Sequence, residues 1–335
     1  MFLRLRIRAC PQSRYGPAVL ALRRTVVTAV DGAWAETELG RAWSDPALHP
    51  PPQPGDEVVV NVQARALGLG SGGYDLVVAN LTRGLDADGP PGVHVMKLNY
   101  TPVQHAVEVA DGDPARARGP VATIGLHGQL APLAWAFAQA GGGRLGYVQT
   151  AGGALPGGLS RTVAELRERG LLATHVTAGP AYGGEREAIS TAGAIAAALD
   201  GCDAVVCGPG PGILGSGTAL GHGGLVALDS AHAALALGLP AIVVPRMSAS
   251  DPRERHRGLS HHTRTVLDLL LAPVIVALPE GEAAPAGDRH DWWTASGALD
   301  GFPWPQRSMG RDDPLLFAAA AAGGRVLAAT LHGDE

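Results

Sequence analysis

The stretch Pro120-Val-Ala-Thr-Ile-Gly-Leu126, followed by a helical segment that runs through Ala138, begins a pattern that recurs along the second half of the chain. Further apolar runs of this kind begin at Arg144, Ala173, Ala204, Ala241 and Ala272. Strands that alternate with helices are typical of right-handed βαβ units, which build a parallel sheet covered by helices on both faces. The sequence therefore predicts a doubly wound, mainly parallel, Rossmann-like α/β domain over residues 116–279.

The segment before this domain has a different pattern. Short β-branched or alternating runs are separated there by Gly, Pro and Asp, and they cover Arg24–Val30, Asp56–Val62, Tyr74–Asn80 and His94–Tyr100. Closely spaced strands of this kind predict a small β-barrel or sandwich, which we assign to residues 1–115.

The last segment, residues 280–335, is expected to pack on the α/β domain. Its first part, over residues 279–305, has the composition of a polar linker that tryptophans dock onto the domain. A short helix should follow, with Asp313 as its N-cap and Pro314 at its first position.

Composition argues against several classes of partner. The 335 residues include 26 basic and 31 acidic side chains, a formal net charge of -5, which gives no general attraction for nucleic acid or an anionic membrane. The 3 cysteines form no Cys-x-x-Cys pair, and we identify neither a signal peptide nor an uninterrupted apolar run of the roughly 18–20 residues that a membrane span needs. We therefore expect a cytoplasmic protein without nucleic-acid or membrane partners. The sequence specifies no cofactor and leaves homo-oligomer formation open.

The most unusual segment is the basic loop, Arg246-Met-Ser-Ala-Ser-Asp251-Pro-Arg253-Glu-Arg255-His256-Arg257-Gly-Leu-Ser260-His261-His262-Thr263-Arg264. It follows a predicted strand, so it should lie at the carboxyl edge of the sheet, where α/β proteins bind ligands. Arginine forks suit carboxylates and phosphates, and histidine transfers protons near neutral pH. We predict acid–base roles for His256 and His261, and ligand contacts from Arg246, Arg253, Arg255, Arg257 and Ser260.

Two other interpretations of the basic loop remain open. Asp251, His256 and one of the pair His261-His262 could supply three ligands to a metal ion. The whole loop could instead be a solvated crossing held by salt bridges. Because adjacent residues at the start of a helix cannot point the same way, we expect one of the two histidines to reach the site and the other to cap or pack.

A glycine-rich loop follows another predicted strand and precedes a helix. It reads Gly208-Pro-Gly-Pro-Gly-Ile-Leu-Gly215-Ser216-Gly217-Thr218. Glycines let backbone N–H groups approach an anion, and a helix N-terminus adds a favourable partial charge. We predict that it contacts the ligand; a packed glycine turn is the alternative. The residues expected to take part are Gly208, Gly210, Gly212, Ser216 and Thr218.

Polar residues also follow the neighbouring strands. We predict ligand contacts from Gln129, Thr150 and Thr177. His127 could act as a base or ligand, or simply bond to backbone, and Glu185 could be the carboxylate of this edge or a charge in the first turn of a helix.

Rare residue types give one more indication. Lys97 is the only lysine, and Asn61, Asn80 and Asn99 are the only asparagines. A compositional bias has removed these types elsewhere, so the survivors are candidates for specific chemistry, although asparagine also serves turns well. We predict that Lys97 reaches the ligand cleft or a carboxylate such as Glu185, with an exposed strand charge as the alternative.

Several long motifs, in one order, resemble those of a bacterial family catalogued as domain of unknown function 3866. The resemblance covers nearly the whole chain and rests on Leu67–Tyr74, His94–Pro102, Gly125–Leu130, Gly208–Thr218, Asp251–Thr263 and Ser308–Arg311. It implies no biochemical activity. The family pattern more often carries aspartate where Ala151 stands and histidine where Pro180 stands, so the resemblance implies that this member lacks two polar groups and puts in doubt any mechanism that needs them.

These observations lead to three hypotheses about function. The first is an enzyme, or a descendant of one, that acts on a small anionic metabolite, perhaps phosphorylated, at the carboxyl edge of the sheet. The second is a non-catalytic ligand sensor whose N-terminal barrel is a partner module. The third is an oligomeric scaffold in which the basic loop is an interface.

Overall fold

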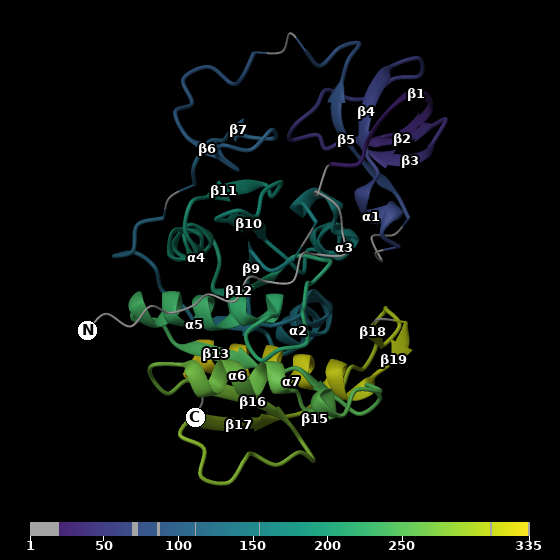
Figure 1. Cartoon of the computed structure of the whole chain (residues 1–335). Helices are drawn as coiled ribbons and strands as arrows, with labels where there is room; N and C mark the ends of the chain where they lie inside the picture. Colours follow the sequence, from purple (N-terminus) through teal and green to yellow (C-terminus); the bar gives the residue numbers. More distant parts are fainter. Residues whose placement is uncertain are drawn as a thin grey trace, which may run out of the picture. The chain divides into compact units, whose positions relative to one another are not determined.

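The computed structural model describes residues 20–68, 73–85, 88–110, 112–153, 155–308 and 310–333. The chain divides into two compact units, Met1–Asp88 and Gly89–Glu335 (Figure 1), which we describe separately. Residues 89–115, which the sequence pattern groups with the β-rich segment, fall within the second unit. Cys10 and parts of the motifs Leu67–Tyr74 and Ser308–Arg311 lie outside the described residues.

The first unit contains a closed barrel with the strand order β1-β2-β3-β5-β4. Its elements are β1 (Leu22–Asp31), β2 (Trp34–Thr37), β3 (Gly40–Trp43), β4 (Glu57–Asn61), α1 (Gln63–Ala66) and β5 (Asp75–Asn80). Alternation decides which side chains point inward, so β4 buries Val58 and Val60 against Val27 and Val77. Because β4 pairs with both β1 and β5, the predicted small β-domain is a barrel and leaves no open sheet edge there.

Two of the three asparagines serve turns in this unit. The Oδ1 atom of Asn61 accepts a hydrogen bond from the backbone N of Gln63 at 2.9 Å, and that of Asn80 accepts from the backbone N of Thr82 at 3.0 Å. Both are Asx turns, in which the short amide replaces a backbone acceptor. The turn interpretation therefore explains these two residues.

The second unit is built on an eight-stranded sheet with the order β11-β10-β9-β12-β8-β13-β16-β17, and every neighbouring pair in it is parallel (Figure 1). Its strands are β8 (Val121–Ile124), β9 (Leu145–Thr150), β10 (Thr174–Ala178), β11 (Arg186–Ala188), β12 (Ala204–Pro209), β13 (Ala241–Val244), β16 (Ile275–Pro279) and β17 (Asp291–Ala295). The Rossmann-like prediction is confirmed.

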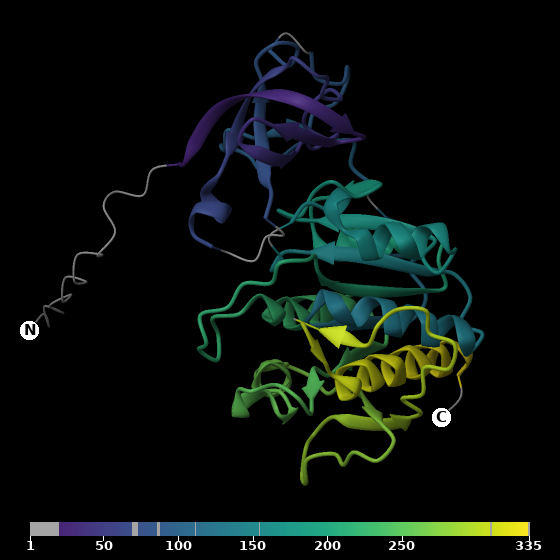
Figure 2. The same cartoon turned by 90° about the vertical axis from the view of Figure 1, so that its right-hand side faces the viewer.

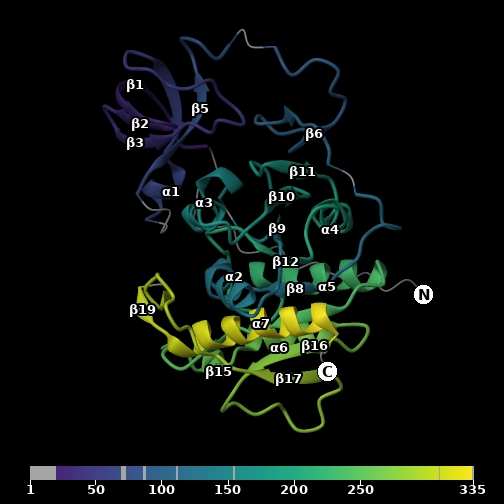
Figure 3. The ribbon, with the colours of Figure 1, turned by 180° about the vertical axis from the view of Figure 1, so that it is seen from behind.

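Helices cover both faces of this sheet. The helices are α2 (Leu130–Gln139), α3 (Arg161–Glu168), α4 (Thr191–Leu199), α5 (Val226–Ala236), α6 (His261–Leu269) and α7 (Pro314–His332), and the single 3₁₀ turns are η1 (His127–Gln129), η2 (Gly157–Leu159), η3 (Gly223–Leu225) and η4 (Glu254–His256). One apolar core joins α4, α5 and α6 to the sheet, on the face seen in Figure 1. The other joins α2, α3 and α7 to the opposite face, which Figure 3 presents.

The connections diverge at the centre of the sheet. The chain leaves β8 through α2 on one face to reach β9, whereas it leaves β12 through α5 on the other face to reach β13. Because β8 and β12 are hydrogen-bonded neighbours, the point of divergence lies between their carboxyl ends. Ligands of open α/β sheets bind at such topological switch points.

Two edge strands differ from the sequence prediction. β11 follows Glu185, where we expected the start of a helix, and β17 lies inside the predicted polar linker. Trp292 and Trp293 in β17 pack into opposite cores, because successive side chains of a strand point to opposite faces. A short edge strand is stabilised by pairing with a strand that is distant in sequence. Its own residues therefore give little strand pattern, and polar flanking residues make the segment resemble a loop.

The strand predicted over His94–Tyr100 is much shorter. Only β6 (Met96–Lys97) forms, paired with β7 (His105–Ala106). Leu98 and Tyr100 adopt φ of 52° and 62°, left-handed conformations that interrupt an extended strand. Two further hairpins, β14 (Met247–Ser248) with β15 (Gly258–Leu259) and β18 (Arg307–Ser308) with β19 (Arg311–Asp312), shape the carboxyl edge.

Helix α7 is longer than the short helix that we predicted. Among the described residues it is the one helix long and apolar enough, by length and composition, to cross a membrane. Its small residues let it pack closely in the core: a Cβ on Gly323 would lie 2.6 Å from Val244, and one on Gly324 would overlap backbone of α2. Leu327 and Val326 are buried against the sheet, so α7 is a core helix here.

Candidate functional site

Four loops meet at the carboxyl edge of the sheet. A Cβ on Gly217, in the glycine-rich loop after β12, would lie 3.5 Å from Arg255 in the basic loop after β13. A Cβ on Gly224 would lie 2.9 Å from the carbonyl oxygen of Gly125, after β8, and Gly223 touches the loop after β9. Figure 2 shows the loops after β12 and β13 on the same side of the unit.

Asp251 is the centre of the basic loop. It is 1% exposed, and its Oδ2 atom lies 3.2, 2.8 and 3.3 Å from guanidinium nitrogens of Arg246, Arg253 and Arg311. Arg257 donates from Nε to the backbone carbonyl of Asp251 at 3.1 Å. The hydrogen bond from Arg253 is the main cause that holds the pKa of Asp251 well below its usual range. Asp251 is therefore an anchor for arginines.

A second carboxylate braces the basic loop from another part of the chain. Asp313 precedes α7, with Pro314 at the first helical position as predicted, but its side chain makes no cap hydrogen bond. It accepts instead from the Ser248 hydroxyl at 2.5 Å and from the backbone N of Ala249 at 3.2 Å.

The arginines around Asp251 leave positive charge in excess. Among the described residues, the carboxylates of Asp251 and Asp313 are those recorded near Arg246, Arg253 and Arg311, and Arg257 bonds to the backbone carbonyl of Asp251. The Nε atom of Arg311 is buried and has no hydrogen-bond partner among the described residues. Arg255 is exposed beside Gly217, and no described acid forms an ion pair with it. A locally cationic, partly desolvated edge attracts anions.

Four histidines pack beside these arginines. The ring centroids of His256, His261 and His262 lie 4.4 to 4.8 Å apart, and His222 stacks on His262 at 3.6 Å and 6°. Both members of the adjacent pair enter this histidine cluster, so our expectation that only one would do so was wrong. His261 and His262 lie about 100° apart around the axis of α6. Both can enter the cluster because His256 in η4 and His222 each contact both rings.

Burial keeps the histidine cluster neutral at pH 7. It lowers the pKa of His256 to about 4 and that of His262 to about 2, with help from Arg246 and His222 respectively. The pKa values of His222 and His261 are also lowered, mainly by burial. Arg246 donates to Nδ1 of His262 at 3.2 Å, whereas the Nε2 atoms of His256 and His261 are buried without a described partner.

Ser260 and Asp251, which the metal alternative offered as a ligand, bond to groups within the protein. The Oγ atom of Ser260 accepts from the backbone N of His262 at 3.2 Å as the N-cap of α6, and lies 2.8 Å from Nδ1 of His256. The carboxylate of Asp251 is held by guanidinium groups and lies outside the group of side chains that could hold a metal ion, which comprises His256, His261 and His262. In the described residues, the group that could hold a metal ion thus includes the histidines of the metal alternative but not Asp251.

Packing explains much of the glycine-rich loop. A Cβ on Gly208 would overlap Ile124, and one on Gly210 would overlap the amide of Gln149. Gly212 has φ 78°, a left-handed conformation that favours glycine. Ser216 and Thr218 are exposed, and their hydroxyls lie 3.1 Å apart. Close packing thus accounts for Gly208 and Gly210 without a ligand.

His127 belongs to a separate buried network. Its Nε2 lies 2.8 Å from the Ser160 hydroxyl and its Nδ1 lies 3.2 Å from the carbonyl oxygen of Pro209. Tyr147 donates to the same carbonyl at 3.0 Å, and His175 stacks on Tyr147 at 5.3 Å. Burial lowers the pKa values of His127 and His175 to about 4. Sequence reasoning missed Tyr147 and His175, because both lie inside apolar-looking strands.

Two predicted ligand contacts are buried and bonded to backbone. Gln129 accepts from the backbone N of Gly125 and Leu126, and donates to the carbonyl oxygens of Val244 and Pro245. The hydroxyl of Thr150 donates to the carbonyl of Ala151 at 3.3 Å. Gln129 thus joins the loop after β8 to that after β13, which is a structural role.

Lys97 is buried and pairs with a carboxylate, but with a different one from that predicted. Its Nζ lies 2.6 Å from Oε2 of Glu187 and donates to the carbonyl oxygens of Thr177 and Ala181 at 2.9 and 2.6 Å. The Thr177 hydroxyl donates to the same carboxylate at 2.6 Å. The parallel register of β10 and β11 sets Thr177 opposite Glu187, whereas Glu185 lies two residues earlier and pairs with Arg167.

We expect Lys97→Arg to lower the free energy of unfolding by about 1–3 kcal/mol, the usual cost of overfilling a packed site. Three acceptors surround a compact ammonium, and a planar guanidinium is too large for that space. Urea denaturation measures the effect. Arg116→Lys, at an exposed pair with Asp200, is the control and should change stability by less than about 0.5 kcal/mol. Equal stability of the two variants would contradict the prediction.

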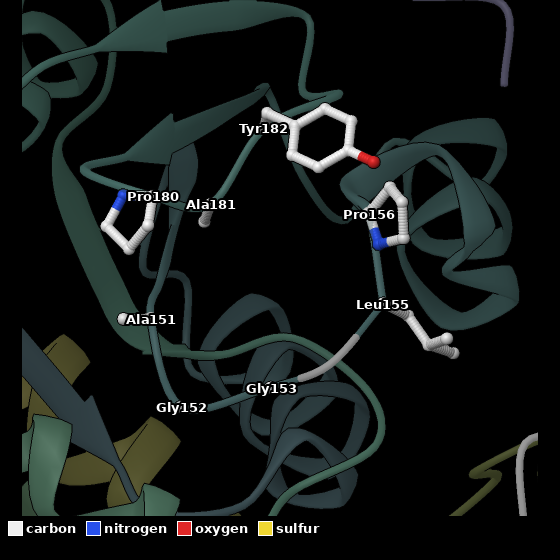
Figure 4. A pocket seen from close by; sticks show the side chains of 8 residues that line it. All are labelled: Ala151, Gly152, Gly153, Leu155, Pro156, Pro180, Ala181 and Tyr182. Carbon is white, nitrogen blue, oxygen red and sulfur yellow. The ribbon is translucent and has the colours of Figure 1, made fainter. Parts of the chain in front are cut away.

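A pocket of about 150 Å³ lies near this network (Figure 4). It is lined by Ala151, Gly152, Gly153, Leu155, Pro156, Pro180, Ala181 and Tyr182. Ala151 and Pro180 lie on one side of it, across from Leu155 and Pro156. Ala151 and Pro180, the two positions at which the resemblance implied missing polar groups, therefore share one pocket, and none of the eight residues is charged.

A family model described as protein of unknown function (DUF3866) matches residues 41–324. The chain belongs to this family. The match covers the predicted site residues, from Lys97 to the basic loop, and confirms the resemblance. No curated protein and no solved structure matches the chain.

Proposed function

We propose that the second unit binds a small anion, such as phosphate or the phosphate or carboxylate group of a metabolite, at the basic loop. The observation that carries this proposal is the excess of guanidinium groups around Asp251. Arg246 is 5% exposed, so water hydrates its charge poorly. A bound anion would supply the stabilisation that this missing water does not give. Arg255, with no described ion-pair partner, would meet the anion from the solvent side.

The leading form of this proposal is an enzyme acting on an anionic metabolite. Unpartnered, neutral imidazole nitrogens of His256 and His261 would then accept protons beside the bound anion. A second candidate is a non-catalytic sensor. It is favoured by the state of three other predicted catalytic residues, since His127, Glu185 and Lys97 all have polar partners within the protein. Binding of a metabolite with no turnover would support the sensor.

Location and assembly are part of the proposal. We place the protein in the cytoplasm, in keeping with the free, buried thiols of Cys202 and Cys207. We propose no nucleic-acid or membrane partner. A homo-oligomer with the basic loop at its interface is the alternative use of the same arginines.

The test is stabilisation by anions. At matched ionic strength and in EDTA, sulfate or phosphate at 100-fold above Kd should stabilise the fold by about 2.7 kcal/mol over chloride, or roughly 5–10 °C in Tm. The double variant Arg255→Gln and Arg257→Gln should lose this difference, because it removes two exposed cations of the site while leaving the core intact.

The control is Arg23→Gln with Arg116→Gln, which removes the same charge from exposed positions elsewhere. It should keep the full difference between sulfate and chloride. If both double variants lose the difference equally, the effect is general screening and the anion site is wrong.

A further inference from the structure

Three imidazole rings of the histidine cluster bring their ring nitrogens together. One potential ligand atom from each of His256, His261 and His262 lies within 4.8 Å of the others. His256 is fully buried, and its Nε2, like that of His261, has no described hydrogen-bond partner. A buried polar atom left unpaired destabilises a fold, because it has given up its hydrogen bonds to water. The histidine cluster holds four such atoms, because both ring nitrogens of His222 are also buried without a described partner, and together they indicate a missing ligand.

The hydrogen bond of His256 orients one of these nitrogens. Its Nδ1 lies 2.8 Å from the Ser260 hydroxyl oxygen. When Nδ1 carries the proton and donates to Ser260, Nε2 presents its lone pair to the cluster. Metal-ligating histidines are held in this way, with the second ring nitrogen donating to a neighbouring oxygen. The other tautomer would bury an Nε2–H without an acceptor.

We propose that His256 and His261 bind a divalent transition-metal ion through Nε2, with His262 as a third ligand. Nitrogens on one tetrahedral ion at about 2.0 Å lie about 3.3 Å apart. Atoms within 4.8 Å of one another reach that spacing through small side-chain rotations. Imidazole ligands select Zn²⁺, Co²⁺ or Ni²⁺ over Mg²⁺ and Ca²⁺, which prefer oxygen.

His262 differs from the other two. Its Nδ1 accepts a hydrogen bond from Arg246, so a neutral His262 carries its proton on Nε2. It joins the metal through Nδ1 only when the hydrogen bond from Arg246 is given up and the lone pair is free. His222 stacks face to face on His262 at 3.6 Å, so both rings cannot direct lone pairs in their planes at the same ion. The site therefore keeps open positions for water or for another ligand, as catalytic metal sites do.

The arginines around Asp251 oppose a lone dication and favour an anion beside it. A metal bound by neutral histidines and an anion bound by arginines would compensate each other, and such coupling is reciprocal. This coupling rests on the proposed anion site, whereas the metal site itself rests on the histidines alone. We therefore expect the metal to bind more tightly in sulfate than in chloride.

The experiment titrates untagged, EDTA-treated and dialysed protein with Co²⁺, in chloride and in sulfate buffer of equal ionic strength. We expect one Co²⁺ per chain by equilibrium dialysis, with visible d–d absorption that reports nitrogen ligands, and at least about 10-fold tighter binding than in His261→Asn. Without metal, this half-buried substitution should leave the Tm within a few degrees of wild type. His256→Asn should show the same loss of binding.

His94→Asn is the matched control, because it removes an exposed histidine of the same unit. It should bind Co²⁺ like wild type. The proposal is overturned if binding is absent in both buffers, if His261→Asn binds as tightly as wild type, or if His94→Asn loses as much affinity. Failure of the anion site alone would instead remove the sulfate stabilisation measured in EDTA while Co²⁺ binding persists.

Discussion

Asp251→Asn should lower the free energy of unfolding of the second unit by about 3–5 kcal/mol, the cost of leaving a buried charge without its partner. Asparagine keeps the shape of aspartate but removes the charge that three guanidinium groups share. Arg246 suffers most, since its side chain is only 6% exposed and cannot turn to water. Arg253 and Arg311 are partly exposed and can recover hydration.

Guanidinium denaturation measures this loss, and Asp200→Asn provides the control. Asp200 pairs with Arg116 at the surface, where removing a partner costs about 0–1 kcal/mol. Sulfate should restore more stability to Asp251→Asn than to wild type, because the variant has one more unpaired positive charge. If the two asparagine variants differ by less than about 1 kcal/mol, Asp251 is not the anchor that its burial indicates.

Lowering the pH from 7 to 5 should destabilise the second unit by about 4 kcal/mol through His127 and His175 alone. Burial lowers both pKa values from the ordinary 6.5 to about 4. Between pH 6.5 and 4 the unfolded chain therefore binds protons that the folded chain does not, so stability falls as the pH falls. Each group contributes about 2 kcal/mol at pH 5 and levels off below pH 4.

Urea denaturation at several pH values, in EDTA, tests this slope. The double variant His127→Gln and His175→Gln should be less stable at pH 7, because it disturbs the network with Ser160 and Tyr147, but its stability should depend less on pH. His94→Gln, at an exposed site, should keep the wild-type slope. Histidine NMR signals of these two residues that titrate near pH 6.5 would contradict the prediction.

Local pattern predicted the α/β unit because its buried strands are mostly apolar and are separated by glycines and helix caps. Val121–Ile124 and Ala241–Val244 are buried at every position, as central parallel strands require. Ser160, a residue type that favours N-caps, accepts from the backbone N of Val163 at 3.1 Å at the start of α3. Apolar runs and helix caps depend on residues that are close in sequence, so strands and helix ends of this kind can be predicted without knowledge of the tertiary structure.

The candidate site was predicted less completely. The basic loop stood out by composition, and its arginines and histidines do lie together. Arg311 and Asp313 join them from some 60 residues away in sequence, and His222 joins from the preceding loop. No local pattern marks these three, since each has an ordinary sequence context.

Which carboxylate meets which cation also depended on distant contacts. Lys97 was identified by its rarity, but the choice of Glu187 over Glu185 follows from the register of β11 against β10, two strands that pair through backbone hydrogen bonds. Residue types and spacing thus predicted the fold class and the edge of the sheet at which the basic loop lies. The partners of each charged side chain were settled by strand register and loop packing, because ion pairs form between groups that the fold brings within a few ångströms, regardless of their separation along the chain.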